Sequence, residues 1–127
     1  MDSVVAMDSQ VAVSHALINI GAASIPSMLR WAGSSNQSEY VSAVYVLSQI
    51  NAQPTAVVPV LVASLSRTNF EVRLWAVEAL GKFGTEAQTA APALVQALRD
   101  PNGQVRRAAT NALKQIDPEA ATQAGVK

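Results

Sequence analysis

The chain has 127 residues, enough for one compact domain, and its 9 basic and 9 acidic side chains give a formal charge of zero. This balance creates no overall field that would attract nucleic acid or an anionic membrane surface. Because the chain has no cysteine, disulfides, thiol catalysis and cysteine-based zinc sites are excluded. Half of the residues are hydrophobic and only 14% are charged, which is typical of a folded chain rather than a disordered one.

The first segment of the chain, residues 1–20, weakly matches the second half of a unit that recurs later. Leu17 lies 33 residues before Ile50, as the repeat requires, but Gln10 and Ser14 stand where the later units have alanine and leucine. We therefore expect a lone, irregular N-terminal helix. Arg30 is the first basic residue, and no apolar run reaches the roughly 18 residues of a membrane span. We expect no secretory signal, no membrane association and a cytoplasmic location.

Prolines mark an internal repeat in the rest of the chain, because Pro26, Pro59 and Pro92 are spaced by 33 residues. Stacking the segments on these prolines needs no gap. The aligned core positions are Ala43, Ala76 and Ala109, followed four residues later by Leu47, Leu80 and Leu113. The three units cover residues 21–53, 54–86 and 87–119.

Each unit has the pattern of two helices. Apolar residues around the proline recur at the spacing of an amphipathic helix, and the proline is expected in its first turn, where a missing N–H costs little. Polar, turn-forming residues then end this helix. Asn36, Asn69 and Asn102 are expected to cap the second helix, and Glu39 completes a capping-box pattern in the first unit. Each unit is therefore predicted to be a helical hairpin.

The last segment, residues 120–127, begins what would be a fourth first helix and ends after about two turns. A single hairpin cannot bury both of its apolar stripes, whereas stacked hairpins share a continuous core. We expect this short tail to be a weak cap that leaves part of the third hairpin's apolar stripe uncovered.

Two stretches carry a resemblance to a known family. Residues 100–113, which read DPNGQVRRAATNAL, and residues 71–84, which read EVRLWAVEALGKFG, resemble HEAT repeats in the short bacterial form often called PBS-lyase HEAT-like. The resemblance implies an all-α fold, an α-α superhelix of three 33-residue hairpins plus an N-terminal helix. We predict one HEAT-like solenoid domain over residues 1–127.

In this family an arginine after the valine commonly joins a ladder of aspartates between repeats. Arg73 and Arg106 match the arginine position, and Asp100 matches the acidic one. The first unit departs from the pattern, with Tyr40 in place of arginine and Ser34 in place of aspartate. We expect the ladder to be incomplete at the N-terminal end.

The sequence offers little catalytic chemistry. His15 is the only histidine, so a catalytic triad or a histidine-rich metal site has no basis. Gly81 and Gly84 fall near a helix end, where we interpret them as C-cap residues rather than a phosphate loop. We predict a protein that is not an enzyme and has no catalytic residue, metal or cofactor.

Some relatives with these repeats are bilin lyases, which handle tetrapyrroles, so a chromophore-handling role is a minor alternative implied by the resemblance alone. Nucleic acid binding is disfavoured, although basic side chains gather in the third unit, because acids offset them nearby. These basic residues are Arg99, Arg106, Arg107 and Lys114.

The remaining hypothesis is binding of another protein. Second helices usually line the concave side of such solenoids, and their positions opposite the core run from apolar and aromatic to basic. We predict a non-enzymatic scaffold whose concave groove holds a protein or peptide segment. The expected contacts are Val41, Tyr45, Leu74, Trp75, Glu78, Arg107 and Asn111. Trp75 has two open interpretations, packing between repeats and contact with a ligand.

The alternative hypothesis is a structural role. Residues 1–66 carry only four charged side chains, which are Asp2, Asp8, Arg30 and Glu39. A helical surface with so few charges is unusual for a monomer. Self-association into a homo-oligomer, or docking to a larger assembly through this N-terminal half, is therefore the second prediction.

Overall fold

The computed structural model describes residues 16–126, and this part of the chain consists of helices joined by short loops, with no strand. Residues 16–20 are helical, and the rest of the predicted N-terminal helix lies outside the described residues. The elements that follow are η1 (Gly21–Ser24), α2 (Ile25–Ala32), α3 (Gln37–Gln49), α4 (Pro54–Ser64), α5 (Phe70–Phe83), η2 (Gly84–Ala90), α6 (Ala91–Ala97), α7 (Gly103–Ile116) and α8 (Pro118–Gln123).

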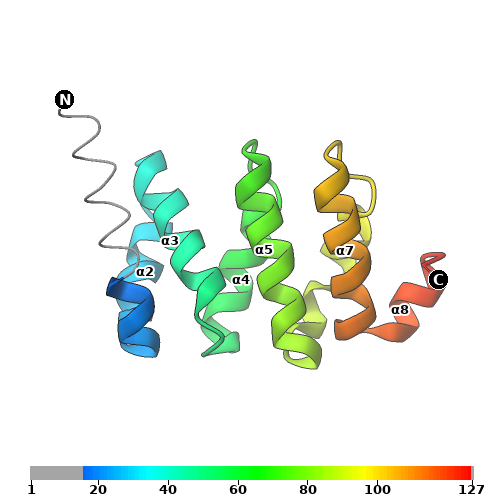
Figure 1. The fold of residues 1–127 in the computed structure, drawn as a ribbon, viewed down its shortest axis with the longest axis horizontal. Helices are drawn as coiled ribbons and strands as arrows, with labels where there is room; N and C mark the ends of the chain where they lie inside the picture. The colour runs from blue at the N-terminus through cyan, green and yellow to red at the C-terminus, as the bar shows by residue number, and fades with distance from the viewer. Residues whose placement is uncertain (1–15, 127) are drawn as a thin grey trace.

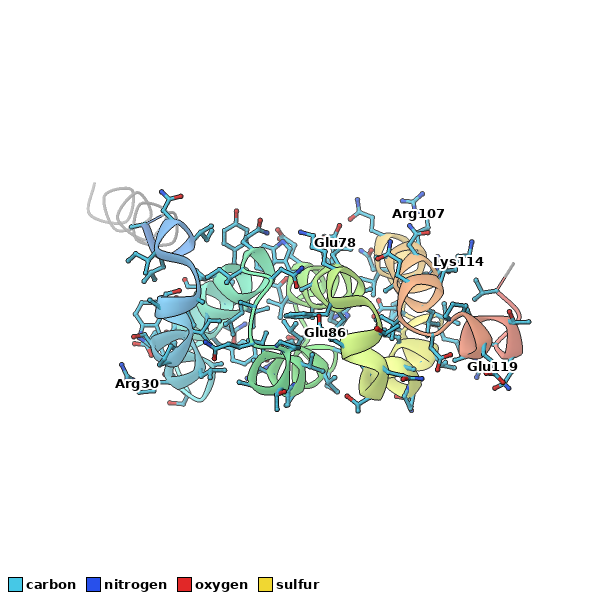
Figure 2. The ribbon with its side chains drawn as sticks, turned by 90° about the horizontal axis from the view of Figure 1, so that it is seen from below. Arg30, Glu78, Glu86, Arg107, Lys114 and Glu119 are labelled. Atoms are coloured by element: carbon cyan, nitrogen blue, oxygen red, sulfur yellow. The ribbon has the colours of Figure 1, made fainter. Side chains whose placement is uncertain are left out.

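The helices pair into hairpins, α2 with α3, α4 with α5, and α6 with α7, and the hairpins stack in a row. Figure 1 shows α3, α5 and α7 side by side. Seen from below in Figure 2, these second helices form one layer and the first helices form the other. The all-α solenoid predicted from the repeat is therefore confirmed.

Asparagine caps begin the second helix of every hairpin, as predicted. The side chains of Asn36, Asn69 and Asn102 each accept a hydrogen bond from a backbone N–H in the first turn. The capping box is not formed in the first unit, because the N–H of Asn36 donates to Ser34 Oγ at 3.0 Å instead of to the Glu39 carboxylate. The serine just before the helix thus takes the acceptor role.

The proline placement is correct in two hairpins and wrong in the middle one. Pro26 and Pro92 lie in the first turn of α2 and α6. Helix α4 begins earlier, at Pro54, so Pro59 lies inside the helix. A proline there removes the hydrogen bond to the carbonyl four residues back, that of Thr55. Both Pro59 and Thr55 are exposed, so water can satisfy that carbonyl.

The core runs through the centre of the stack. Leu47, Leu80 and Leu113 are each 0% exposed, at equivalent places in the three hairpins. Helix α8 packs against both α6 and α7. The prediction that part of the third hairpin's apolar stripe stays uncovered is therefore wrong for α7, where Ile116 is 1% exposed, whereas Val95 on α6 stays half-buried.

Arg73 joins the second hairpin to the third. Its Nε donates to Asp100 Oδ2 at 2.8 Å and its Nη2 donates to Oδ1 at 3.1 Å, a two-pronged ion pair. Its Nη1 also donates to the carbonyl oxygens of Arg67 and Thr68, at 2.7 and 2.9 Å. The Arg73 side chain therefore links the loop before α5 to the loop before α7 through charge-assisted hydrogen bonds.

The junction between the first and second hairpins uses different chemistry at the same position. Tyr40 takes the place of the arginine, and its hydroxyl shares a hydrogen bond with Ser64 Oγ over 2.8 Å. The Arg67 guanidinium carbon lies 3.6 Å from the centre of the Tyr40 ring, a cation–π contact. Within residues 16–126 the ladder therefore has a single ion pair, that of Arg73 and Asp100, and an aromatic contact replaces it at the N-terminal junction.

The Asp100 carboxyl makes the fold sensitive to acid. Partial burial by itself raises the pKa of this group, but hydrogen bonds from Arg73 and the Asn102 N–H, with the charges of Arg73 and Arg106, hold it below its ordinary value. A pKa lowered by folding adds stability that is present above the unfolded-state pKa of about 3.9 and is lost as pH falls through the folded-state pKa.

We expect the free energy of unfolding to depend less strongly on pH under acidic conditions in Asp100→Asn than in the wild type. The wild type should lose unfolding free energy more steeply than the variant below about pH 4, because only the wild type must protonate this ion-paired carboxylate. Urea unfolding at several pH values between about 2 and 7 measures the difference. An equally steep loss of unfolding free energy below about pH 4 in the two proteins would contradict the lowered pKa of Asp100.

Candidate binding groove

On the exposed side of the second-helix layer, a groove of about 450 Å³ lies between α5 and α7. The residues that line it on α5 are Leu74, Val77, Glu78, Gly81 and Lys82. Those on α7 are Gln104, Arg107, Ala108, Asn111, Ala112 and Gln115. The groove therefore lies along two parallel helices from neighbouring hairpins.

Gly81 sets how close the two helices come. A Cβ on this residue would lie 3.2 Å from the Ala112 Cβ and 3.4 Å from the Gln115 Oε1, which is tighter than ordinary contact. Gly81 is buried inside α5, so its predicted role as a C-cap is wrong, whereas Gly84 does end the helix with a φ of 62°. Two small residues thus let the helices meet and form the floor of the groove.

The walls are polar where the floor is apolar. On α5, Leu74, Glu78 and Lys82 are spaced by four residues, which places them on one face of the helix. Glu78, Lys82 and Arg107 are exposed, and none of them forms an ion pair within the described part of the chain. Figure 2 shows Glu78 and Arg107 pointing out from neighbouring helices at the same face.

The structure brings together four of the seven predicted contact residues. Leu74, Glu78, Arg107 and Asn111 line this groove. Val41, on α3, is half-buried and lies outside it.

The two predicted aromatic contacts, Tyr45 and Trp75, pack against each other instead of lining the groove. Their ring centres are 5.1 Å apart with an angle of 63° between the planes, an edge-to-face pair between α3 and α5. Both side chains are half-buried. Of the two interpretations left open for Trp75, packing between repeats is the one that this contact supports.

Sequence reasoning missed three side chains that complete the walls, namely Lys82, Gln104 and Gln115. The 33-residue repeat contains a signal for two of them, because Lys82 and Gln115 are equivalent positions. Each also follows a predicted contact, Glu78 or Asn111, by one helical turn of four residues. Extending the predicted contact face of each second helix by one turn therefore identifies Lys82 and Gln115.

Within residues 16–126, no three side chains of the metal-binding types come together, and His15 lies outside the described residues. None of the helices described is both long enough and apolar enough to cross a lipid bilayer.

The fold and the groove define the class of protein: a solenoid of stacked helical hairpins with an open groove between adjacent second helices. A family model for HEAT repeats matches residues 25–114, and the chain therefore belongs to the HEAT-repeat family. Repeats of this family generally serve as scaffolds for protein interactions. The narrower bacterial subtype stays a prediction. No curated protein matches the chain.

Proposed function

We propose that this protein is a non-enzymatic scaffold that binds a protein or peptide segment in the groove between α5 and α7. The observation that carries the proposal is the composition of the groove, an apolar floor between walls that carry both charged and amide side chains. Burial of a partner's apolar side chain against the apolar floor stabilises the complex, and hydrogen bonds and charges on the polar walls fix the orientation of the partner.

The amide side chains favour a peptide as the occupant. Gln104, Asn111 and Gln115 lie along one wall of the groove, and each carries a donor and an acceptor. A peptide backbone also presents donors and acceptors in alternation, so an extended segment satisfies these amides along its length.

The test is to block the groove without changing its charge. Asn111→Trp places a bulky neutral ring on an exposed position of the α7 wall, so the fold should be unaffected and the groove filled. The matched control is Ala63→Trp, at an exposed position on α4 in the other layer. Helicity by circular dichroism checks that both variants fold.

We expect immobilised wild-type protein and the Ala63→Trp control to retain the same partner from a cell extract, and Asn111→Trp to lose it. The identified partner is then titrated against all three proteins to obtain dissociation constants. Equal affinity for the blocked and unblocked groove would show that the partner binds elsewhere.

Self-association through the N-terminal half is the second candidate. Residues 16–66 carry only two charged side chains, Arg30 and Glu39, and Ile20 is 59% exposed. These features favour contact with another chain over an isolated, solvated surface. Light scattering at about 100 μM, a concentration well above the Kd of an ordinary specific dimer, separates the candidates. A monomeric mass would count against self-association.

A further inference from the structure

The charged side chains of the groove stand at three successive levels along the two helices. Glu78 and Lys82 follow Leu74 by four and eight residues on α5. Arg107 is the repeat equivalent of Leu74, 33 residues later, so it stands on the opposite wall at the first level. Gly81 supports this register, because its nearest neighbours on α7 are Ala112 and Gln115.

The order of charges along the groove is therefore positive, negative, positive. Arg107 comes first, Glu78 second and Lys82 third, counted from the N-terminal ends of α5 and α7. All three are exposed, and the single ion pair of the described residues, between Arg73 and Asp100, includes none of them. Their charges are thus available to a partner.

The spacing of these levels fits an extended peptide. Four residues of an α-helix rise by about 6 Å. Two residues of an extended chain advance by about 6.6 Å, and alternate side chains point to the same side. Three alternate side chains of an extended segment therefore span about 13 Å, against about 12 Å for the eight helical residues that separate the first level from the third.

We infer that the groove selects an extended segment in which alternate residues are acidic, basic and acidic. These three side chains point into the groove between its two walls, where the acidic ones pair with Arg107 on α7 and Lys82 on α5 and the basic one pairs with Glu78 on α5. Because this pattern reads the same in both directions, the selection holds whichever way the segment runs. The inference rests on the proposed function and names the chemistry of the segment that the groove accepts.

A single-stranded nucleic acid is the competing occupant, and the groove disfavours it. Its backbone carries a negative charge at every phosphate, so one phosphate would face Glu78, between the two cations. The floor around Val77, Ala108 and Ala112 is apolar and offers no aromatic ring on which a base could stack.

The experiment measures fluorescence polarisation of labelled nonapeptides with the full chain. One peptide carries Glu-x-Lys-x-Glu in a neutral serine and valine context, and a second carries the inverse, Lys-x-Glu-x-Lys. A third peptide, Glu-x-Glu-x-Lys, has the composition and net charge of the first in a different order. A labelled oligothymidylate of 12 nucleotides tests nucleic acid.

We expect the first peptide to bind about tenfold more tightly than the inverse one, the effect of three exposed ion pairs that turn from attraction to repulsion. The third peptide should fall between them, and added salt should reduce the differences. In the triple variant Arg107→Glu, Glu78→Lys, Lys82→Glu the preference should reverse, with the inverse peptide bound more tightly.

Each contrary result has a distinct meaning. Equal binding of the three peptides, blocked by Asn111→Trp, would overturn the charge pattern and leave the proposed function intact. Peptide binding that Asn111→Trp does not weaken would overturn both, since the site would lie elsewhere. Preferential binding of the oligonucleotide, or the absence of any peptide binding, would overturn the charge pattern, and the partner capture would then decide the proposed function.

Discussion

Replacement of Leu80 by alanine is expected to lower the free energy of unfolding by about 2–5 kcal/mol. Leu80 is 0% exposed and lies on α5, which packs against α3, α4 and α7. The truncation removes buried apolar surface and leaves a cavity in the middle of the stack. Because small domains are stable by only about 5–15 kcal/mol, this loss is a large part of the total. Urea unfolding followed by circular dichroism measures it.

The control for this substitution is on the same helix. Lys82→Ala removes an exposed side chain two residues further along α5, and we expect it to change stability by less than about 0.5 kcal/mol. A Leu80→Ala loss as small as that of the control would contradict the packing described for the central hairpin.

Replacement of Arg73 by methionine is expected to cost about 1.5–3 kcal/mol, the range for hydrogen bonds to charged groups. Methionine keeps the apolar stem but loses the ion pair to Asp100 and the bonds to two loop carbonyls. Asp100 would also remain without its cation in a place where its side chain is only 9% exposed. Thermal and urea unfolding give the loss.

Arg106 provides a matched comparison for Arg73, because its Nη1 donates to the carbonyls of Asp100 and Pro101 at 2.6 and 3.1 Å, as Arg73 does in the preceding loop. Arg106 is exposed and forms no ion pair within the described residues. Arg106→Met should therefore cost at least about 1 kcal/mol less than Arg73→Met. Equal losses would mean that the pair between hairpins contributes nothing.

Much of the fold could be predicted from the sequence because its determinants are local and repeated. An asparagine before a helix caps it through its own side chain, and Asn36, Asn69 and Asn102 do so without regard to the rest of the fold. Pro59 could not be placed in the same way. Its position inside α4 depends on a start at Pro54 that the other hairpins do not share.

The groove was harder to predict than the fold. The period of 3.6 residues predicts which side of each second helix points away from the core, and Leu74, Glu78, Arg107 and Asn111 on that side line the groove. That these residues contact a partner stays a prediction. The depression between two helices depends on how closely they pack, which here reflects the absence of a side chain at Gly81. The direction of a side chain also depends on its tertiary neighbours. The repeat pattern therefore left open whether Trp75 packs between repeats or contacts a ligand, and its contact with Tyr45 appears only in the structure.

The most direct measurement of the central claim is a map of amide chemical shifts for the full chain with and without the captured partner segment. If the segment binds between α5 and α7, the largest changes should fall on residues that line the groove, such as Glu78 and Asn111, with small changes on the outer faces of α4 and α6. Changes concentrated on α2 to α4, with α5 and α7 unaffected, would contradict the claim that this groove is the binding surface.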